Sequence, residues 1–290
     1  MSTLVQYTVQ GLAAGSFYAL AALGLAIIFG VLGVVNFAHG AFYMLGAVTA
    51  AVLLDNWGIS LWWALLIVPP LMFVLGVVVE RTLIQWLLPL DPLYNFLLTL
   101  GLAMVCVELV KQKYGVSGLP YQVPHALRGR VDVLGTVLPR YQLFVFVLSL
   151  IVCALVWLLM TRTRVGMIVR ASTERPDLAR ALGINVGRWV TPVFGFGVAL
   201  AGLAGVMSAP FRAITADMGT NFIIILFSVV VIGGLGSIFG AVAAGFVVGL
   251  VEAFGQAYAP TYSQILIFVL MAAVVLFRPA GLFGREELAR

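Results

Sequence analysis

Apolar runs long enough to cross a membrane fill almost the whole of this chain. Of its 290 residues, 63% are hydrophobic and only 9% are charged, whereas a soluble domain carries about a quarter charged residues. A soluble fold of this size could not cover its surface with so few charges. No polar stretch is long enough to form a separate soluble domain, so residues 1–290 are expected to form a single transmembrane domain.

The apolar runs predict the number of crossings, because a helix needs roughly 20 apolar residues to span the hydrocarbon core. Nine candidates are residues 5–29, 34–54, 61–79, 93–110, 141–160, 189–209, 222–234, 238–254 and 262–277. The first two are separated by a few residues, and the seventh and eighth form one block with glycines at its centre. We therefore predict an all-α polytopic membrane protein with eight or nine transmembrane helices, some of them broken or re-entrant.

The charges indicate an orientation. The net charge of +5 comes from basic residues in the gaps between apolar runs, which is the pattern of membrane orientation and not of nucleic-acid binding. Loop 111–140 has five basic residues and one acid, and loop 161–188 has six arginines and two acids. The positive-inside rule makes 161–188 cytoplasmic and 111–140 external. The N-terminus is then expected outside and the C-terminus in the cytoplasm.

The cytoplasmic loop predicts short helices. Pro176 suits the first position of a helix, and Gly183 suits the position just after its end. An ordinary positive-inside loop explains the arginines, but it does not explain the Ala/Leu spacing, which predicts an amphipathic helix that docks a protein. The residues expected to take part are Arg170, Ala171, Glu174, Pro176, Ala179, Leu182, Gly183 and Ile184.

A polar motif, Asn36-Phe37-Ala38-His39-Gly40, lies inside an apolar region. Amide and imidazole groups at membrane depth face the protein interior or water, because exposure to lipid is costly. One interpretation is a broken helix whose freed backbone and side chains line a pathway. The other is that Asn36 caps a helix after a tight turn and that His39 packs near the interface. Spacing alone does not decide the depth of this motif.

A glycine-rich run interrupts the long apolar block near its centre. Gly233, Gly234, Gly236 and Ser237 belong to this run. Interrupted hydrophobic segments in the two halves of a transporter indicate its working centre, so these residues are candidates for gating or for lining a pathway. The alternative is a simple glycine turn between two spans.

Three acids lie in or beside apolar runs. Glu108 is close to two lysines and is expected at the interface, and Asp217 precedes a span. Glu252 is the best candidate for a buried role, either as a proton or cation site or paired with a neighbour.

Several kinds of chemistry have no support in the sequence. There is no phosphate-binding loop of the G-x-x-x-x-G-K-[ST] type and no H-E-x-x-H motif. Two histidines and two cysteines, Cys106 and Cys153 within apolar runs, predict neither a metal site nor a disulfide framework. An intramembrane enzyme is therefore the weakest of three interpretations, after a transporter permease and a secondary carrier or channel for a small solute.

The chain resembles a known family over nearly its whole length. The matching segments are 32–40 (LGVVNFAHG), 43–47 (YMLGA), 99–102 (TLGL), 164–166 (RVG), 170–171 (RA), 177–185 (DLARALGIN), 233–237 (GGLGS) and 278–284 (RPAGLFG). In order and spacing they are similar to the permease subunit of branched-chain amino acid ABC importers, the Liv-type permeases. One departure is Phe239, where the family pattern leads us to expect proline.

The resemblance implies more than the residues show. It implies a bacterial inner-membrane permease without an ATPase site or cofactor of its own, paired with a second, similar permease. Two cytoplasmic ATPase subunits would use ATP, and a periplasmic or lipid-tethered binding protein would deliver the solute. Residues 170–184 would couple the permease to an ATPase. Related permeases carry urea, short amides or other amino acids, so the resemblance identifies the family but not the solute.

Overall fold

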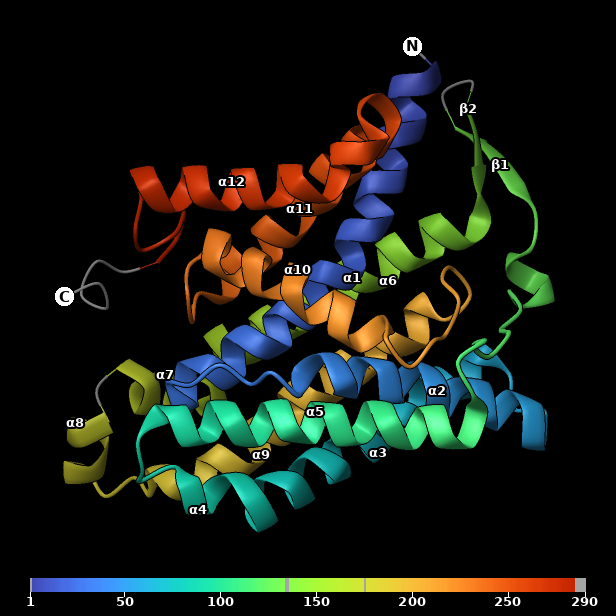
Figure 1. Cartoon of the computed structure of the whole chain (residues 1–290). Helices are drawn as coiled ribbons and strands as arrows, with labels where there is room; N and C mark the ends of the chain where they lie inside the picture. Colours follow the sequence, from blue (N-terminus) through green and yellow to red (C-terminus); the bar gives the residue numbers. More distant parts are fainter. Residues whose placement is uncertain (1, 134–135, 175, 285–290) are drawn as a thin grey trace.

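The computed structural model describes residues 2–133, 136–174 and 176–284, and it is an all-α bundle (Figure 1). Seven of the described helices are long and apolar enough to cross a membrane. They are α1 (Ser2–Leu32), α3 (Leu61–Val79) with its extension, α5 (Pro92–Tyr114), α6 (Arg140–Arg162), α9 (Val186–Ser208), α11 (Ile238–Tyr258) and α12 (Ser263–Phe277) with the preceding turn η3 (Pro260–Tyr262). The extension of α3 consists of a π-helical turn, η1 (Glu80–Ile84), and α4 (Gln85–Leu87).

Two further helices complete the set. They are α2 (His39–Trp57) and α10 (Met218–Gly233). Each of the nine apolar runs coincides with one of these nine helices, so the prediction of an all-α polytopic membrane protein with broken segments is confirmed.

Local sequence explains where several helices begin. The side chains of Asp91, Asn185 and Ser237 accept hydrogen bonds from backbone N–H groups in the first turns of α5, α9 and α11. Such caps satisfy donors that have no partner within the helix. In α5, Pro92 follows the cap directly, a position where its missing N–H costs nothing.

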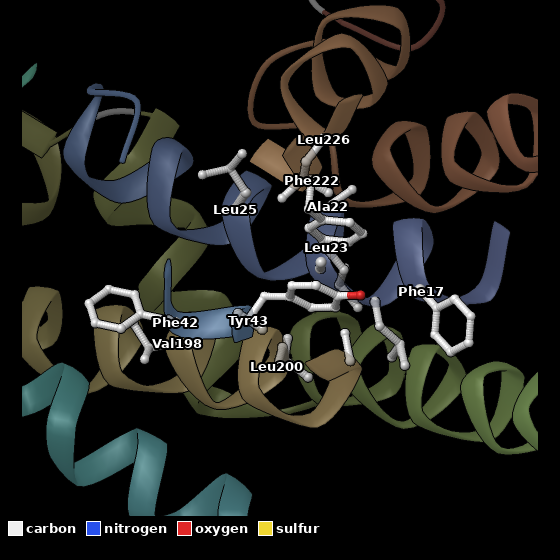
Figure 2. Packing of buried hydrophobic residues seen from close by; sticks show 14 of the residues in the cluster. Phe17, Ala22, Leu23, Leu25, Phe42, Tyr43, Val198, Leu200, Phe222 and Leu226 are labelled. Carbon is white, nitrogen blue, oxygen red and sulfur yellow. The ribbon is translucent and has the colours of Figure 1, made fainter. Parts of the chain in front are cut away.

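Small residues bring the central helices together. A Cβ built on Gly249 of α11 would collide with the backbone of Gly15 in α1, and one on Gly76 of α3 would press on Gly195 of α9. Close approach through small residues replaces the hydrophobic drive that lipid does not provide between helices. Large side chains such as Phe42, Tyr43 and Phe222 fill the remaining space at the centre (Figure 2).

The helices repeat their arrangement. The contacts of α1, α2, α3 and α5 recur in α9, α10, α11 and α12, since α1 packs on α10 as α9 packs on α2, and α2 packs on α3 as α10 packs on α11. The two most extensive helix interfaces, α1 with α11 and α9 with α3, correspond to each other under this repeat. Gly24 of α1 lies against Gly197 and Leu200 of α9, whereas Ile28 lies against Gly197, so the two helices run antiparallel. The two halves are therefore inverted repeats, the architecture found in many transporters.

The two ends of the bundle differ. At one end, loop 115–139 carries η2 (His125–Leu127) and an antiparallel hairpin of β1 (Arg130–Val133) and β2 (Thr136–Pro139), in which Val131 pairs with Leu138. At the other end lie α7 (Arg164–Glu174) and α8 (Pro176–Ala181). The chain starts near the hairpin end, and α12 runs toward the end that holds α7 and α8 (Figure 1).

Candidate functional site

The motif at Asn36–His39 breaks the chain within the bundle. The imidazole of His39 is fully buried, and its Nε2 lies 3.0 Å from the carbonyl oxygen of Ala21 in the middle of α1. Because α1 continues to Leu32, roughly 16 Å further at about 1.5 Å per residue, the chain must turn back before α2 can start. Helix α2 thus begins well inside the bundle, which agrees with the broken-helix interpretation.

Asn36 organises this break. Its Oδ1 accepts a hydrogen bond of 3.0 Å from the backbone N–H of Ala38 and so orders the turn before α2. The N-cap residue of α2 is Ala38, and no side chain caps the helix, so the interpretation in which Asn36 is the cap does not hold. From α5, the Oγ1 of Thr99 accepts a hydrogen bond from the backbone N–H of Phe37 at 3.3 Å. The break is therefore held from two sides by side-chain oxygens that replace missing helical partners.

Helix α10 starts in contact with α2. A Cβ on Gly40 of α2 would collide with the carbonyl oxygen of Gly219 in α10, and a Cβ on Gly219 would collide with that of Gly40. The first turns of α2 and α10 thus cross inside the bundle. Their N-terminal ends, which carry partial positive charge, meet where the two inverted repeats join.

Aromatic rings lie beside this crossing. The rings of Tyr43 and Phe222 are stacked with centroids 3.9 Å apart, and the ring of Tyr18 is also stacked on Phe222, with centroids 5.5 Å apart. Tyr18 belongs to α1, Tyr43 to α2 and Phe222 to α10. The stack therefore joins helices from both repeats around the crossing (Figure 2).

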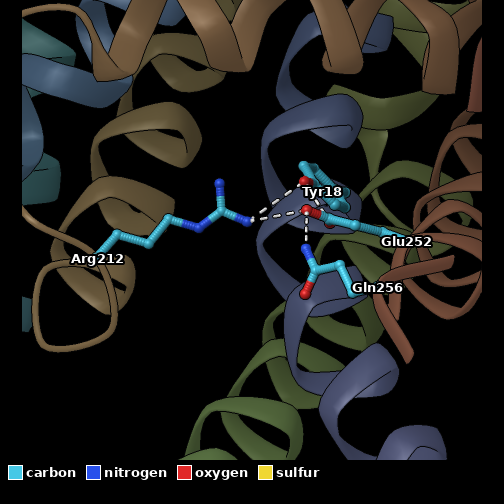
Figure 3. Close-up of polar contacts among 4 residues, drawn as sticks. All are labelled: Tyr18, Arg212, Glu252 and Gln256. Carbon is cyan, nitrogen blue, oxygen red and sulfur yellow. Dashed lines mark hydrogen bonds and ion pairs between the residues drawn. The ribbon is translucent and has the colours of Figure 1, made fainter. Parts of the chain in front are cut away.

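Glu252 of α11 lies in a buried polar cluster (Figure 3). Its side chain accepts hydrogen bonds from the Tyr18 hydroxyl at 2.7 Å and from Gln256 Nε2 at 3.3 Å. One guanidinium nitrogen of Arg212 lies 3.6 Å from Glu252 and 3.4 Å from the Tyr18 hydroxyl. Glu252 is 8% exposed, so its predicted buried position agrees with the structure, and the acid is paired with a neighbour.

Arg212 approaches this cluster from the segment between α9 and α10. Residues 209–217 return from the end of α9 to the start of α10, and Leu119 of the hairpin-end loop donates its N–H to the Ile214 carbonyl at 2.9 Å. Asp217 pairs with Lys111 of α5 at 2.8 Å, and Glu108 is exposed. The cluster therefore fastens this returning segment to both repeats.

The glycine run forms a turn at the end of the bundle that holds α7 and α8. Gly234 and Gly236 have φ of +103° and +78°, a region that favours glycine, and Ser237 caps α11. The chain after α12 packs on this turn, since Leu282 and Phe283 donate backbone hydrogen bonds to Ile232 and Gly233. This geometry matches the simple-turn interpretation, and a gating role for these residues stays a prediction.

Phe239 occupies the position where the family pattern led us to expect proline. Its ring is exposed and packs edge-on against Phe283, with centroids 5.0 Å apart. The substitution thus adds a contact between α11 and the chain that follows α12.

The candidate coupling residues form α7, α8 and the turn after them. Helix α8 begins at Pro176 as predicted, and Gly183 has φ of +82° just beyond the helix. Val169, Ser172 and Ala179 are buried. Arg170, Ala171 and Leu182 are exposed, and the side chain of Glu174 lies outside the described residues.

Two members of the Glu252 cluster, Arg212 and Tyr18, were not predicted from the sequence. Arg212 is the only basic residue between residues 189 and 277, and this isolation was a usable signal. Tyr18 gave no such signal, because a tyrosine within an apolar run is usually a residue of the hydrophobic core. No group of three or more potential metal ligands occurs in the described part of the chain.

Comparison with known proteins identifies the family. Residues 7–275 match the family described as the permease component of branched-chain amino acid transport systems. The chain belongs to this permease family. The permease is 31% identical to the high-affinity branched-chain amino acid transport permease BraD of Pseudomonas aeruginosa, over 99% of this chain and 97% of BraD.

Other relatives place the permease within the family. It is 28% identical to LivH of Escherichia coli, over 99% of this chain and 97% of LivH. It is 25% identical to LivM of the same organism, over 91% of this chain and 67% of LivM. No solved structure matches the permease. The resemblance drawn from the sequence motifs is thus confirmed.

Proposed function

We propose that this permease is the membrane-spanning subunit of an ABC importer that moves a branched-chain amino acid across the bacterial inner membrane. The observation that carries the proposal is the match to BraD and LivH over nearly the full length of all three chains. Those relatives are branched-chain amino acid transport permeases. Their solute class is therefore the first to test for this permease.

The energy source lies in partner subunits. The sequence lacks a phosphate-binding loop, so two cytoplasmic ATPase subunits bind and hydrolyse the ATP. A second, related permease completes the pathway, and the likeness to both LivH and LivM supports such pairing. A periplasmic or lipid-tethered binding protein delivers the solute to the hairpin end.

The orientation follows from the charges and the two ends of the bundle. The arginine-rich loop with α7 and α8 faces the cytoplasm under the positive-inside rule, and the basic loop with β1 and β2 faces outward. The N-terminus is then outside and the C-terminus inside.

The crossing of α2 and α10 supplies a mechanism. Half-helix N-termini at membrane depth attract the anionic group of a substrate, and an amino acid presents a carboxylate. The pathway switches between outward and inward access when ATP binding changes the ATPase pair. The solute must bind the two states with different affinities for this coupling to work.

The α7–α8 segment is the docking surface for an ATPase. Met167, Leu178 and Leu182 present apolar side chains outward at this end, and Leu182 is 81% exposed. Apolar side chains beside arginines at a membrane surface suit a protein partner. Val169 and Ala179 are buried beneath them and hold the segment on the bundle, so it can transmit movement to α1, α6 and α9.

A matched glycine pair tests this coupling. Gly183 and Gly58 have φ of +82° and +64°, and a Cβ added to either residue would have no other atom within 4 Å. We expect Gly183→Val to abolish ATP-driven leucine uptake in reconstituted vesicles while ATP hydrolysis continues. Gly58→Val, with the same backbone strain at the opposite end, should keep the coupling. Equal coupling in both variants would contradict the assignment of the docking surface.

The second candidate function is a secondary carrier or channel for a small solute. The observation that favours it is the paired ion cluster around Glu252, which resembles part of a relay in an ion-coupled carrier. Uptake by vesicles that contain this permease alone, driven by an ion gradient and independent of ATP, would support this candidate.

A further inference from the structure

An open cavity lies where α3 ends and α9 begins. Its volume is about 500 Å³, and it is lined by Arg81, Gln85, Asn185, Gly187, Arg188 and Thr191. The cavity lies outside the crossing of α2 and α10, the Glu252 cluster and the surface formed by α7 and α8. Cavities of this size hold small molecules or headgroups, so its lining indicates what it binds.

The cavity is positively charged. Among the residues that the structure describes, no carboxylate forms an ion pair with Arg81 or Arg188. The adjacent acid, Glu80, is buried, and its Oε2 accepts a 2.6 Å hydrogen bond from the Thr191 hydroxyl. Glu80 is thus engaged beneath the cavity, and both guanidinium groups remain available to an anion.

The start of α9 adds the positive end of a helix to the same place. Asn185 caps the helix by accepting a hydrogen bond from the N–H of Arg188 at 3.2 Å, and Gly187 has no side chain to cover the first turn. The partial positive charge at a helix N-terminus favours an anion. Here it lies beside two arginines and the amide of Gln85, which together suit the bidentate recognition of a phosphate.

The exposed side chains beside the cavity place it at the level of the lipid headgroups. Trp86 is adjacent to Gln85 and is 70% exposed, and exposed tryptophans collect at the membrane–water interface. Leu83 on the same turn is also exposed. A ligand with an anionic head and an apolar tail would therefore contact arginines within the cavity and apolar side chains beside it.

We propose that this cavity binds the phosphate headgroup of an anionic phospholipid. Basic pockets between transmembrane helices bind such headgroups, and the π-helical turn η1 brings Arg81 and Gln85 to the rim. The proposal does not rest on the transported solute or on the ATPase partners. The main competitor for the cavity is an acidic segment of an ATPase subunit, because α7 and α8 contact the same helix, α9.

Native mass spectrometry of the detergent-purified chain tests the proposal with phosphatidylglycerol, phosphatidylcholine and inorganic phosphate as separate probes. We expect one phosphatidylglycerol to bind tightly, with phosphatidylcholine and free phosphate much weaker. The double variant Arg81→Gln, Arg188→Gln should bind phosphatidylglycerol roughly ten-fold more weakly, since each arginine contributes to attraction by anionic lipid. The matched control is Arg162→Gln, Arg164→Gln, which removes the same charge at the same end and should lose less than about two-fold.

The outcomes separate the alternatives. Equal losses in both double variants would show general charge attraction, and unchanged binding in the cavity variant would show that the lipid binds elsewhere; both overturn the proposal. Tight binding of free phosphate would also overturn the proposal. The proposal also fails if the cavity variant keeps the lipid but no longer co-purifies with ATPase subunits. If the glutamine variant does not fold, Arg81→Lys, Arg188→Lys keeps the charge but loses bidentate geometry. It should fold and bind the lipid with intermediate affinity, and wild-type affinity would contradict the proposed contacts.

Discussion

The backbone of Gly40 at the start of α2 lies against the backbone of Gly219 at the start of α10, so that a Cβ on either residue would collide with the carbonyl oxygen of the other. This contact joins the two inverted repeats at the N-terminal ends of α2 and α10. It explains why the second residue of each of these helices is a glycine.

Gly40→Ala should lower the free energy of unfolding by about 1–3 kcal/mol, the usual cost of overpacking, and should reduce transport. Gly219→Ala should behave alike. Thermal unfolding in detergent and uptake in vesicles measure the two effects. Gly101→Ala in α5 is the control, because nothing lies within 4 Å of its Cβ position. Wild-type stability in both crossing variants would contradict the close packing.

Thr99 holds the break before α2 by accepting a hydrogen bond from the N–H of Phe37. Thr99→Val keeps the shape but removes the acceptor, and an unpaired N–H costs about 1–3 kcal/mol. We expect lower thermal stability and slower uptake, whereas Thr99→Ser keeps the hydroxyl and should stay near wild type. If valine and serine variants behave alike, the hydroxyl does not support the break.

The Glu252 cluster should show energetic coupling. Tyr18→Phe removes the 2.7 Å hydrogen bond to Glu252, and Glu252→Gln removes its charge beside Arg212. Each change should lower the free energy of unfolding by about 1–3 kcal/mol. In the double variant the loss should be smaller than the sum by at least about 0.5 kcal/mol. A double-mutant cycle of thermal unfolding tests this, and strict additivity would show that the groups do not interact.

The hairpin-end loop should carry a pH dependence at high pH. Burial raises the pKa of the Tyr121 phenol to about 12, above its ordinary value near 10. The folded protein therefore favours the neutral phenol, and this stabilisation is complete below pH 10 and is lost as the pH rises toward 12. Tyr121→Phe should therefore lose less stability than the wild type when the pH is raised from 9 to about 11. Tyr262→Phe, at an exposed position, should follow the wild type.

Hydropathy was sufficient to predict the fold class and the position of the apolar helices, because a helix that contacts lipid must be apolar along its length. It could not predict where α2 starts relative to α1. The depth of His39 depends on the contact with Ala21, which is a tertiary property. The sequence therefore left two interpretations of the Asn36–His39 motif open. The structure agrees with the broken helix, since His39 is buried beside Ala21 and the N-cap of α2 is Ala38.

The buried position of Glu252 could also be predicted, because an isolated acid in an apolar run must face the protein interior. Its partners could not. Tyr18 lies 234 positions away in the chain, and Arg212 approaches from a returning segment that hydropathy assigns to a loop. The inverted repeat was hidden for a similar reason, since its two halves share helix order and glycine contacts without an obvious common motif.

The measurement that tests the central claim most directly is co-purification of the tagged permease from native membranes in mild detergent, followed by mass spectrometry. We predict recovery of a second permease of the same family together with ATPase subunits. Recovery of this chain alone, from membranes in which it supports solute uptake, would contradict the importer assignment and favour a carrier or channel.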